Sequence, residues 1–278
     1  EHVIAGAGSD ELIDLLFRLF TSPRDQVLDC DPTFGMYTFC AAIAGAEVKS
    51  IPRDANFELD VSKVIDAIES RTKMIFINSP NNPTGNHTTE KQLRALLETD
   101  LLVVVDEAYY EFSGETAFGL IREFENLVVL RTFSKWAALA GLRVGYGFMS
   151  PKLVTSLISI KSPYNVNSGA EAAALTSLED ANLLLERVNL IVEERERVFS
   201  VLKNIPGIRP LPSGGNYILC EFAKDRAASM YASLASQGIF LRRFGHPRLS
   251  DFIRTSIGTP EQNNRLLDAL NKLVLEQE

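Results

Sequence analysis

The sequence predicts an α/β fold in which a mainly parallel sheet has helices on both faces, followed by a smaller α+β unit. Short apolar runs of strand length alternate with amphipathic helical stretches as far as Phe148. Runs that are apolar throughout, such as 101–105, are typical of strands buried on both faces, as parallel strands are. After about Pro163 the pattern changes, with long helices first and strands later.

The elements of the first part alternate in type along the chain. The first residues are expected to form a strand that enters a glycine turn, and Ser9 then begins a helix with Leu12 and Leu16 on one face. The next strands are expected at 26–30, 47–51, 74–77, 101–105, 127–130 and 144–148, and the next helices at 34–44, 61–69 and 90–97.

The second part is expected to begin with a helix at 168–178 and a long charged helix at 182–204. The elements that follow are expected to be a strand at 216–221, a helix at 227–237, strands at 239–242 and 252–256, and a closing helix. We therefore expect a large α/β domain at 1–185 and a small α+β domain at 186–278.

The composition excludes several classes of protein. A formal net charge of −8 argues against general nucleic-acid affinity, which needs a basic surface. The 3 cysteines and 3 histidines show no paired or clustered spacing, so we expect neither a disulfide framework nor a metal site. A reducing compartment, the cytoplasm, fits this cysteine content. No apolar run reaches the ~18 residues of a membrane span.

The run Gly6-Ala7-Gly8-Ser9-Asp10 is a candidate phosphate site. A glycine turn that opens a helix presents free backbone N–H groups and the positive end of the helix dipole. An ordinary capped turn is the alternative, because Ser9 is a good N-cap by itself.

The run 78–85, Asn-Ser-Pro-Asn-Asn-Pro-Thr-Gly, follows an apolar strand directly. Its two prolines would hold Asn82 rigidly at the carboxyl edge of the sheet, where ligands of such sheets bind. The Asn82 amide suits a phenolate-type oxygen. The alternative is a rigid turn in which asparagine serves turn chemistry alone.

Asp106 closes the apolar run 101–105, and Tyr109 follows three residues later. A carboxylate at the end of such a strand is costly unless it has a partner. A protonated pyridine nitrogen would be one such partner, with the Tyr109 hydroxyl near the same ligand. Loop amides or a neighbouring arginine are the alternative.

Lys135 follows the apolar run 127–130 and lies beside Thr132 and Ser134, with Arg143 eight residues later. Most lysines are surface residues. Here, however, two hydroxyls, an amine and an arginine are grouped so that they could hold a phosphate and an aldehyde together. Together with a distant acid such as Asp106, this grouping is what pyridoxal phosphate (PLP) requires.

Arg254 is expected within an apolar strand, where a guanidinium needs an anion, either a substrate carboxylate or a structural carboxylate. Arg242 belongs to a basic patch nearby and could equally face solvent.

Taken together, these runs resemble the fold-type I PLP-dependent aminotransferases, and within them the histidinol-phosphate aminotransferase branch. The resemblance implies the seven-stranded sheet of that fold type. The runs follow the family's order over nearly the whole chain, and they are 8–11, 32–37, 81–85, 106–109, 134–143 and 216–219.

The resemblance implies roles for individual residues. Lys135 would be the Schiff-base lysine and proton shuttle, and Asp106 would pair with the pyridine nitrogen. Asn82 and Tyr109 would contact the ring hydroxyl. Phe34 would stack on the ring, at a position where tyrosine is common.

The resemblance also places the phosphate and the substrates. The expected phosphate-binding residues are Ser9, Asp10, Thr132, Ser134 and Arg143. Arg254 would take the carboxylate of glutamate or 2-oxoglutarate, with Asn82 as a further substrate contact. Arg242 is a weaker candidate for the phosphate of histidinol phosphate. The implied reaction is ping-pong transamination by a homodimer.

An amino-terminal arm that covers the site is also implied by the resemblance, and we expect it to be lacking here because the chain starts at Glu1 with a strand. A plastid location would require a transit segment before Glu1. Three other functions stay open at this point: a PLP lyase similar to threonine-phosphate decarboxylases, an aromatic aminotransferase, and a non-catalytic domain of the same fold.

Overall fold

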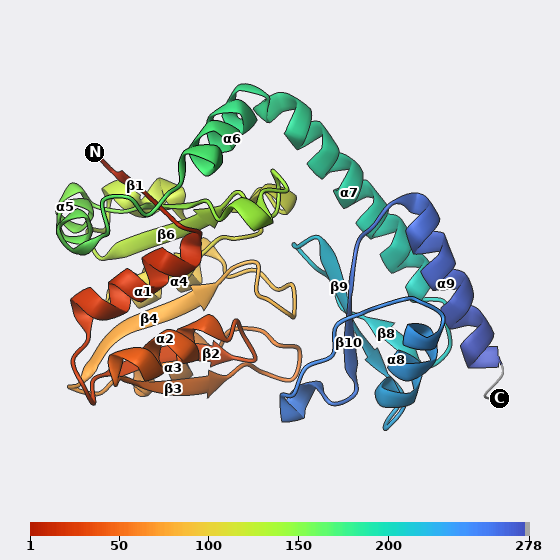
Figure 1. Ribbon diagram of the computed structural model, residues 1–278. Coiled ribbons are helices and arrows are strands. Elements are labelled where there is room, and N and C mark those ends of the chain that lie inside the picture. The colour runs from red at the N-terminus through yellow and green to blue at the C-terminus, as the bar shows by residue number, and fades with distance from the viewer. Residues whose placement is uncertain (276–278) are drawn as a thin grey trace.

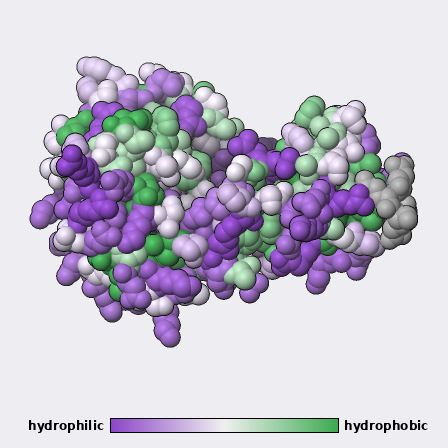
Figure 2. Space-filling view, turned by 90° about the horizontal axis from the view of Figure 1, so that it is seen from below, coloured by the Kyte–Doolittle hydropathy of each residue, from purple (hydrophilic) through white to green (hydrophobic). Residues whose placement is uncertain are grey.

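The computed structural model describes residues 1–275 and has two lobes of unequal size with a narrowing between them (Figures 1 and 2). The larger lobe is built on a seven-stranded sheet with the order β1-β7-β6-β5-β4-β2-β3. Its strands are β1 (Val3–Gly6), β2 (Gln26–Asp31), β3 (Glu47–Pro52), β4 (Thr72–Asn78), β5 (Leu102–Asp106), β6 (Leu127–Thr132) and β7 (Gly145–Phe148). Strands β2 to β6 are parallel, and β7 runs antiparallel to both of its neighbours, β1 and β6.

Helices cover both faces of this sheet because its central strands alternate apolar side chains between the two faces. In β4, Met74 and Phe76 pack with one set of helices, and Ile75 and Ile77 pack with the other. The first set is α1 (Ser9–Phe20), α2 (Met36–Ala44) and α5 (Pro151–Ile160), and the second is α3 (Val61–Asp66), α4 (Glu90–Leu97) and the 3₁₀ turn η2 (Phe118–Arg122).

The smaller lobe is a three-stranded antiparallel sheet with the order β10-β9-β8. It packs its own core of aliphatic side chains, including Ile218 and Ile253, against the end of helix α7 (Ala181–Leu202) and two further helices. The elements are β8 (Ile208–Pro210), β9 (Tyr217–Phe222), α8 (Ala227–Ser236), the 3₁₀ turn η4 (Pro247–Leu249), β10 (Phe252–Ser256) and α9 (Pro260–Leu275).

An arch made of α6 (Ser168–Glu179) and α7 (Ala181–Leu202) joins the two lobes (Figure 1). Side chains of the arch pack with residues from both lobes in one aromatic-rich cluster that contains Tyr109, Trp136 and Tyr217. The indole N–H of Trp136 is buried there without a hydrogen-bond partner among the described residues.

Direct contacts also hold the lobes together. The Tyr217 hydroxyl of β9 donates to the backbone oxygen of Asn81 at 2.6 Å. Arg248 of η4 donates to the backbone oxygens of Arg53 at 2.8 Å and Asp54 at 2.6 Å. The smaller lobe is therefore anchored to loops at the carboxyl edge of the larger sheet.

The structure confirms the α/β fold with its mainly parallel seven-stranded sheet, and it changes several element predictions. The expected strand at 239–242 is wrong, because this segment makes one isolated bridge, Arg242 to Arg254, before the chain turns toward η4. The helix expected at 34–44 begins at Met36, and the one expected at 61–69 ends at Asp66. Helix α5 and the three-residue strand β8 were not predicted. No helix within residues 1–275 combines the length and the apolar character needed to cross a membrane.

Candidate active site at the carboxyl edge of the large sheet

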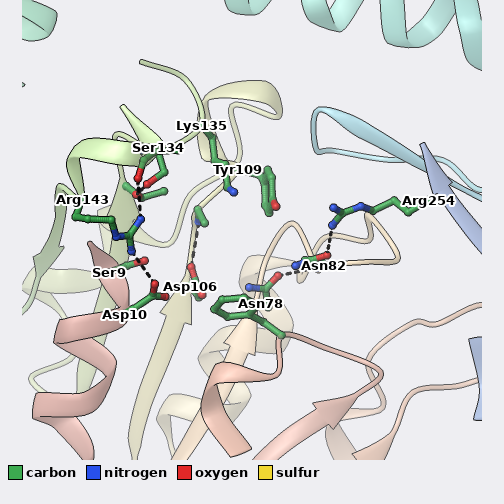
Figure 3. Close-up of a pocket in the computed structure, with 14 residues that line it drawn as sticks. Ser9, Asp10, Asn78, Asn82, Asp106, Tyr109, Ser134, Lys135, Arg143 and Arg254 are labelled. Carbon is green, nitrogen blue, oxygen red and sulfur yellow. Dashed lines mark hydrogen bonds and ion pairs between the residues drawn. The ribbon is translucent and has the colours of Figure 1, made fainter. Parts of the chain in front are cut away.

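The ends of β4, β5 and β6 open onto a cavity of about 220 Å³ (Figure 3). Every candidate residue from the sequence lines this cavity except Arg242, and Asn78, Ala108 and Ala140 line it as well. Because the carboxyl ends of parallel strands meet at one edge of a sheet, this is where a ligand is expected in such a fold.

Asp106 is the last residue of β5 and is 1% exposed. Its Oδ2 accepts a hydrogen bond of 2.9 Å from the Tyr37 hydroxyl, and its Oδ1 accepts one of 3.2 Å from the Ala108 N–H. Burial raises its pKa to about 6, against the lowering effect of these donors. None of the ion pairs formed within residues 1–275 involves Asp106.

Lys135 lies in the loop after β6, and its amine points into the cavity (Figure 3). The Nζ atom lies 5.5 Å from the centroid of the Tyr109 ring. Desolvation lowers the pKa of Lys135, and the Arg254 charge lowers it further, while Asp106 and Asp10 oppose the shift. The shift makes the amine easier to deprotonate, as a nucleophile or base requires.

The candidate phosphate residues surround the start of α1. Arg143 donates to Asp10 Oδ2 at 2.8 Å, and the Ser134 N–H donates to Thr132 Oγ1 at 3.1 Å. Ser9 is the first residue of α1, so the free N–H groups of the first helical turn lie here.

Two glycines make room for this arrangement. Gly8 has a φ of 80°, and a Cβ there would lie 2.5 Å from Arg143 Nη2. A Cβ on Gly145, the first residue of β7, would overlap the backbone nitrogen of Ser9. The space in front of α1 therefore depends on the absence of both side chains.

Asn82 and Arg254 meet across the two lobes. Arg254 Nη1 donates to Asn82 Oδ1 at 2.6 Å, and the guanidinium lies 4.8 Å from the centroid of the Tyr217 ring. Among the described residues no carboxylate pairs with Arg254, and its Nε is buried without a partner. Arg254 is thus a cation with free donors at the cavity wall.

Phe34 and Arg242 differ in placement. Phe34 is half-buried, lines the cavity and packs edge-on against Tyr37 with the ring centroids 5.8 Å apart. Arg242 is exposed and does not line the cavity, although its backbone pairs with that of Arg254. The structure therefore does not bring the Arg242 side chain to the site.

Sequence reasoning missed two residues that contact the site residues from behind. Tyr37 of α2 is fully buried and donates to Asp106, and Asn78, the last residue of β4, donates to Tyr37 at 3.1 Å. A signal for Asn78 was present, because it is a polar residue that ends an apolar run, as Asp106 is. The two residues are register partners across β4 and β5.

The residues present fit PLP. A buried carboxyl that faces a cavity without a cationic partner matches a protonated ring nitrogen. An amine with a lowered pKa, that of Lys135, lies in the same cavity. The start of α1 lies beside Arg143 and is left open by Gly8 and Gly145, so it matches a phosphate.

Comparison with known proteins agrees with this fit. Residues 1–270 match the family described as aminotransferase class I and II. The histidinol-phosphate aminotransferase of Dehalococcoides mccartyi is 44% identical over 273 residues, 98% of this chain and 76% of that protein. That of Roseiflexus castenholzii is 47% identical over 277 residues, 98% of this chain and 75% of that protein.

Solved structures give the same result. The histidinol-phosphate aminotransferase of Clostridium acetobutylicum superposes with a TM-score of 0.91 at 28% identity, covering 99% of this chain and 84% of that one. The Sinorhizobium meliloti enzyme, solved in complex with pyridoxal-5'-phosphate, has a TM-score of 0.90 at 26% identity, covering 100% of this chain and 77% of that one. The chain therefore belongs to the class I and II aminotransferases, a PLP-dependent family of enzymes, and within it to the histidinol-phosphate aminotransferases.

Proposed function

We propose that this chain transfers the amino group of L-histidinol phosphate to 2-oxoglutarate, forming imidazole acetol phosphate and glutamate. The observation that carries the proposal is the convergence of Lys135, Asp106 and Arg143 on one cavity, in a chain 42–47% identical to enzymes named for histidinol phosphate. The same reaction can run in reverse, because transamination exchanges an amino group for a keto oxygen and so leaves the same kinds of bond on both sides.

The proposed roles of the central residues follow from their chemistry. When bound, PLP supplies an electron sink that stabilises negative charge at the substrate carbon. Lys135 would hold the cofactor through its amine and carry a proton to and from that carbon. Asp106 would accept the hydrogen bond of the ring nitrogen and keep that nitrogen protonated. Tyr109 and Asn82 would contact the ring hydroxyl, and Phe34 would stack on the ring.

The phosphate of the cofactor would be held at the start of α1. Ser9 and Asp10 would donate backbone N–H groups, and Thr132 and Ser134 would donate hydroxyls. Arg143 would supply the charge, since its forked donors match a phosphate dianion.

The substrates would be recognised from the smaller lobe. Arg254 would bind the carboxylate of glutamate or 2-oxoglutarate, because its guanidinium has no anionic partner within the described chain. Asn82, already bonded to Arg254, would be a further substrate contact. Arg242 remains a weaker candidate for the phosphate of histidinol phosphate, since its side chain is exposed outside the cavity.

The assay uses purified chain, PLP, L-histidinol phosphate and 2-oxoglutarate, and measures imidazole acetol phosphate and glutamate. We expect the two products in equal amounts, and no product from Lys135→Ala. The matched control Lys135→Arg keeps the positive charge without a usable amine and should be equally inactive.

Three other results would move the assignment. Release of CO₂ without 2-oxoglutarate would indicate a lyase, and phenylalanine outcompeting histidinol phosphate would indicate an aromatic aminotransferase. No turnover with any amino donor would contradict the proposed catalysis.

We also propose that the chain acts as a homodimer. Large apolar side chains are exposed along the arch and the segment before it, among them Tyr164 (91%), Leu190 (64%) and Leu178 (56%), and a second copy would cover them. Light scattering should give twice the 30.8 kDa mass of one chain. A monomer at micromolar concentration would contradict this.

Two further proposals concern organisation. We propose that residues 1–185 act as a PLP-binding domain and 186–278 as a small domain, which limited proteolysis between them would test. We also propose a cytoplasmic location, which the three free cysteines support and which imaging of the tagged protein would test.

A further inference from the structure

Asp106 is held, on the side away from the cavity, by a chain of hydrogen bonds that links β4, α2 and β5. The chain begins at the backbone N–H of Asn82, which donates to Asn78 Oδ1 at 2.7 Å. Asn78 Nδ2 then donates to the Tyr37 hydroxyl oxygen at 3.1 Å. The Tyr37 hydroxyl in turn donates to Asp106 Oδ2 at 2.9 Å.

The direction of every bond in this chain is fixed by its first member. A backbone N–H can only donate, so the side-chain oxygen of Asn78 must face Asn82, and its NH₂ group must face Tyr37. The hydroxyl oxygen of Tyr37 therefore accepts from Asn78.

The Tyr37 proton then needs an acceptor, because the residue is 0% exposed. Within the described residues, the Tyr37 hydroxyl donates its proton to one acceptor, Asp106 Oδ2. The other carboxyl oxygen of Asp106 also accepts, from the Ala108 N–H. Both oxygens are thus arranged to accept, which favours the ionised carboxylate.

We propose that Asn78 is a positioning residue that turns the Tyr37 hydroxyl toward Asp106 and so keeps this carboxylate ready to accept the proton-bearing ring nitrogen of PLP. The ring-nitrogen part rests on the proposed function. The orientation of Tyr37 by Asn78 concerns the chain alone.

The electrostatic setting makes such a device useful. Burial raises the pKa of Asp106 to about 6, and the Tyr37 donor is the strongest effect that opposes it. Without that donor the carboxyl would keep its proton to a higher pH, and a smaller fraction of it would be ionised to pair with a cation near neutral pH. The titratable groups that interact electrostatically with Asp106 or Tyr37 are Asp10 of α1, Asp29 of β2, Arg53 after β3, Tyr109, Lys135 and Tyr217 of β9. Arg254 of β10 acts in turn on Tyr109, Lys135 and Tyr217.

The test is the pKa of Asp106 in the full chain, followed by the ¹³C shift of its carboxyl carbon and assigned with Asp106→Asn. The proteins are the wild type, Asn78→Ala, Tyr37→Phe and the double variant. Each single change should raise the pKa by about one unit, the value of one hydrogen bond to a charged group. The double variant should show little more than Tyr37→Phe alone, because Asn78 acts through Tyr37.

Asn81→Ala is the matched control. Asn81 lies in the loop that follows Asn78 and is fully buried. It donates to the Pro32 backbone oxygen at 2.9 Å and to Thr84 Oγ1 at 2.7 Å, and among the described residues it has no hydrogen bond to Tyr37 or Asp106. Its removal should leave the Asp106 pKa in place. An equal shift in Asn81→Ala, additive effects in the double variant, or no shift in Asn78→Ala would each overturn the proposal.

A second measurement separates this inference from the proposed function. Calorimetric titration of PLP into the wild-type chain tests the cofactor site directly. If PLP does not bind, the proposed function fails, while the pKa pattern still decides the role of Asn78. If PLP binds and the pKa pattern is absent, the proposed function stands and this inference fails.

Discussion

At the scale of single residues, the two adjacent acidic residues at the end of β5, Asp106 and Glu107, point to opposite faces of the sheet. Asp106 faces the cavity, whereas Glu107 accepts from Arg131 Nε at 3.0 Å in a buried ion pair. Glu111, one turn further, is less well compensated. Its Oε2 is buried without a partner in the described structure, and burial raises its pKa to about 7.

Glu111 should make the stability of the protein depend on pH. An acid whose pKa is raised by folding binds its proton more tightly in the folded state, so its contribution is full below about pH 4.5 and is lost as the pH rises toward 7. We expect Glu111→Gln to gain stability relative to wild type over this window, by up to about 3 kcal/mol.

Urea unfolding at a series of pH values measures this difference. The exposed Glu125→Gln serves as the control. A Glu111→Gln difference that stays constant from pH 4.5 to 7 would contradict the role assigned to burial.

At the scale of elements, the site depends on how closely the start of β7 approaches the start of α1. Gly145 permits this approach, since any Cβ there would overlap the Ser9 backbone. The N–H groups of α1 and the Arg143 side chain thus keep a fixed spacing, which a phosphate requires.

Gly145→Ala should therefore weaken PLP binding at its phosphate end. We expect the Kd for PLP to rise at least about tenfold, which is the effect of losing one charge-assisted hydrogen bond to the phosphate. Gly141→Ala is the control, because a Cβ there meets nothing within 4 Å. Equal PLP affinities of the two variants, measured by calorimetry, would show that the approach of β7 to α1 is not limiting.

The element scale also shows what the sequence could predict. The alternation of apolar runs and amphipathic helices was enough to predict the sheet, because central strands such as β5 are buried on both faces. The segment 239–242 misled the prediction because its apolar residues do not pair, and Phe240 is 77% exposed. Tyr37 could not be assigned to the site from the sequence, because its hydroxyl reaches Asp106 only once α2 packs on the sheet, where the Tyr37 ring stacks on Phe76 of β4.

At the scale of the whole molecule, the site is shared between the lobes. Arg254 belongs to the smaller lobe, yet its partner Asn82 belongs to the larger one. Arg248, also of the smaller lobe, hydrogen-bonds to backbone oxygens of the larger lobe, and its guanidinium lies 5.1 Å from the centroid of the Phe57 ring. The position of Arg254 should therefore depend on Arg248.

Arg248→Ala should raise the KM for 2-oxoglutarate about tenfold, as the loss of charged hydrogen bonds allows, and leave the PLP Kd unchanged. Arg209→Ala is the control, because Arg209 pairs with Glu221 inside the smaller lobe. Steady-state kinetics with both variants measure the effect. A change in PLP affinity, or an equal KM change in Arg209→Ala, would contradict the fastening role.

The fluorescence of Trp136 should report on the state of the site. This residue is the one tryptophan of the chain, it follows Lys135 directly, and it lies in the cluster where the arch meets both lobes. Its fluorescence therefore has a single origin and should be quenched by energy transfer to a bound chromophore beside Lys135. A shift in emission wavelength without quenching would instead indicate movement of the lobes, so one unlabelled residue can distinguish cofactor loading from closure.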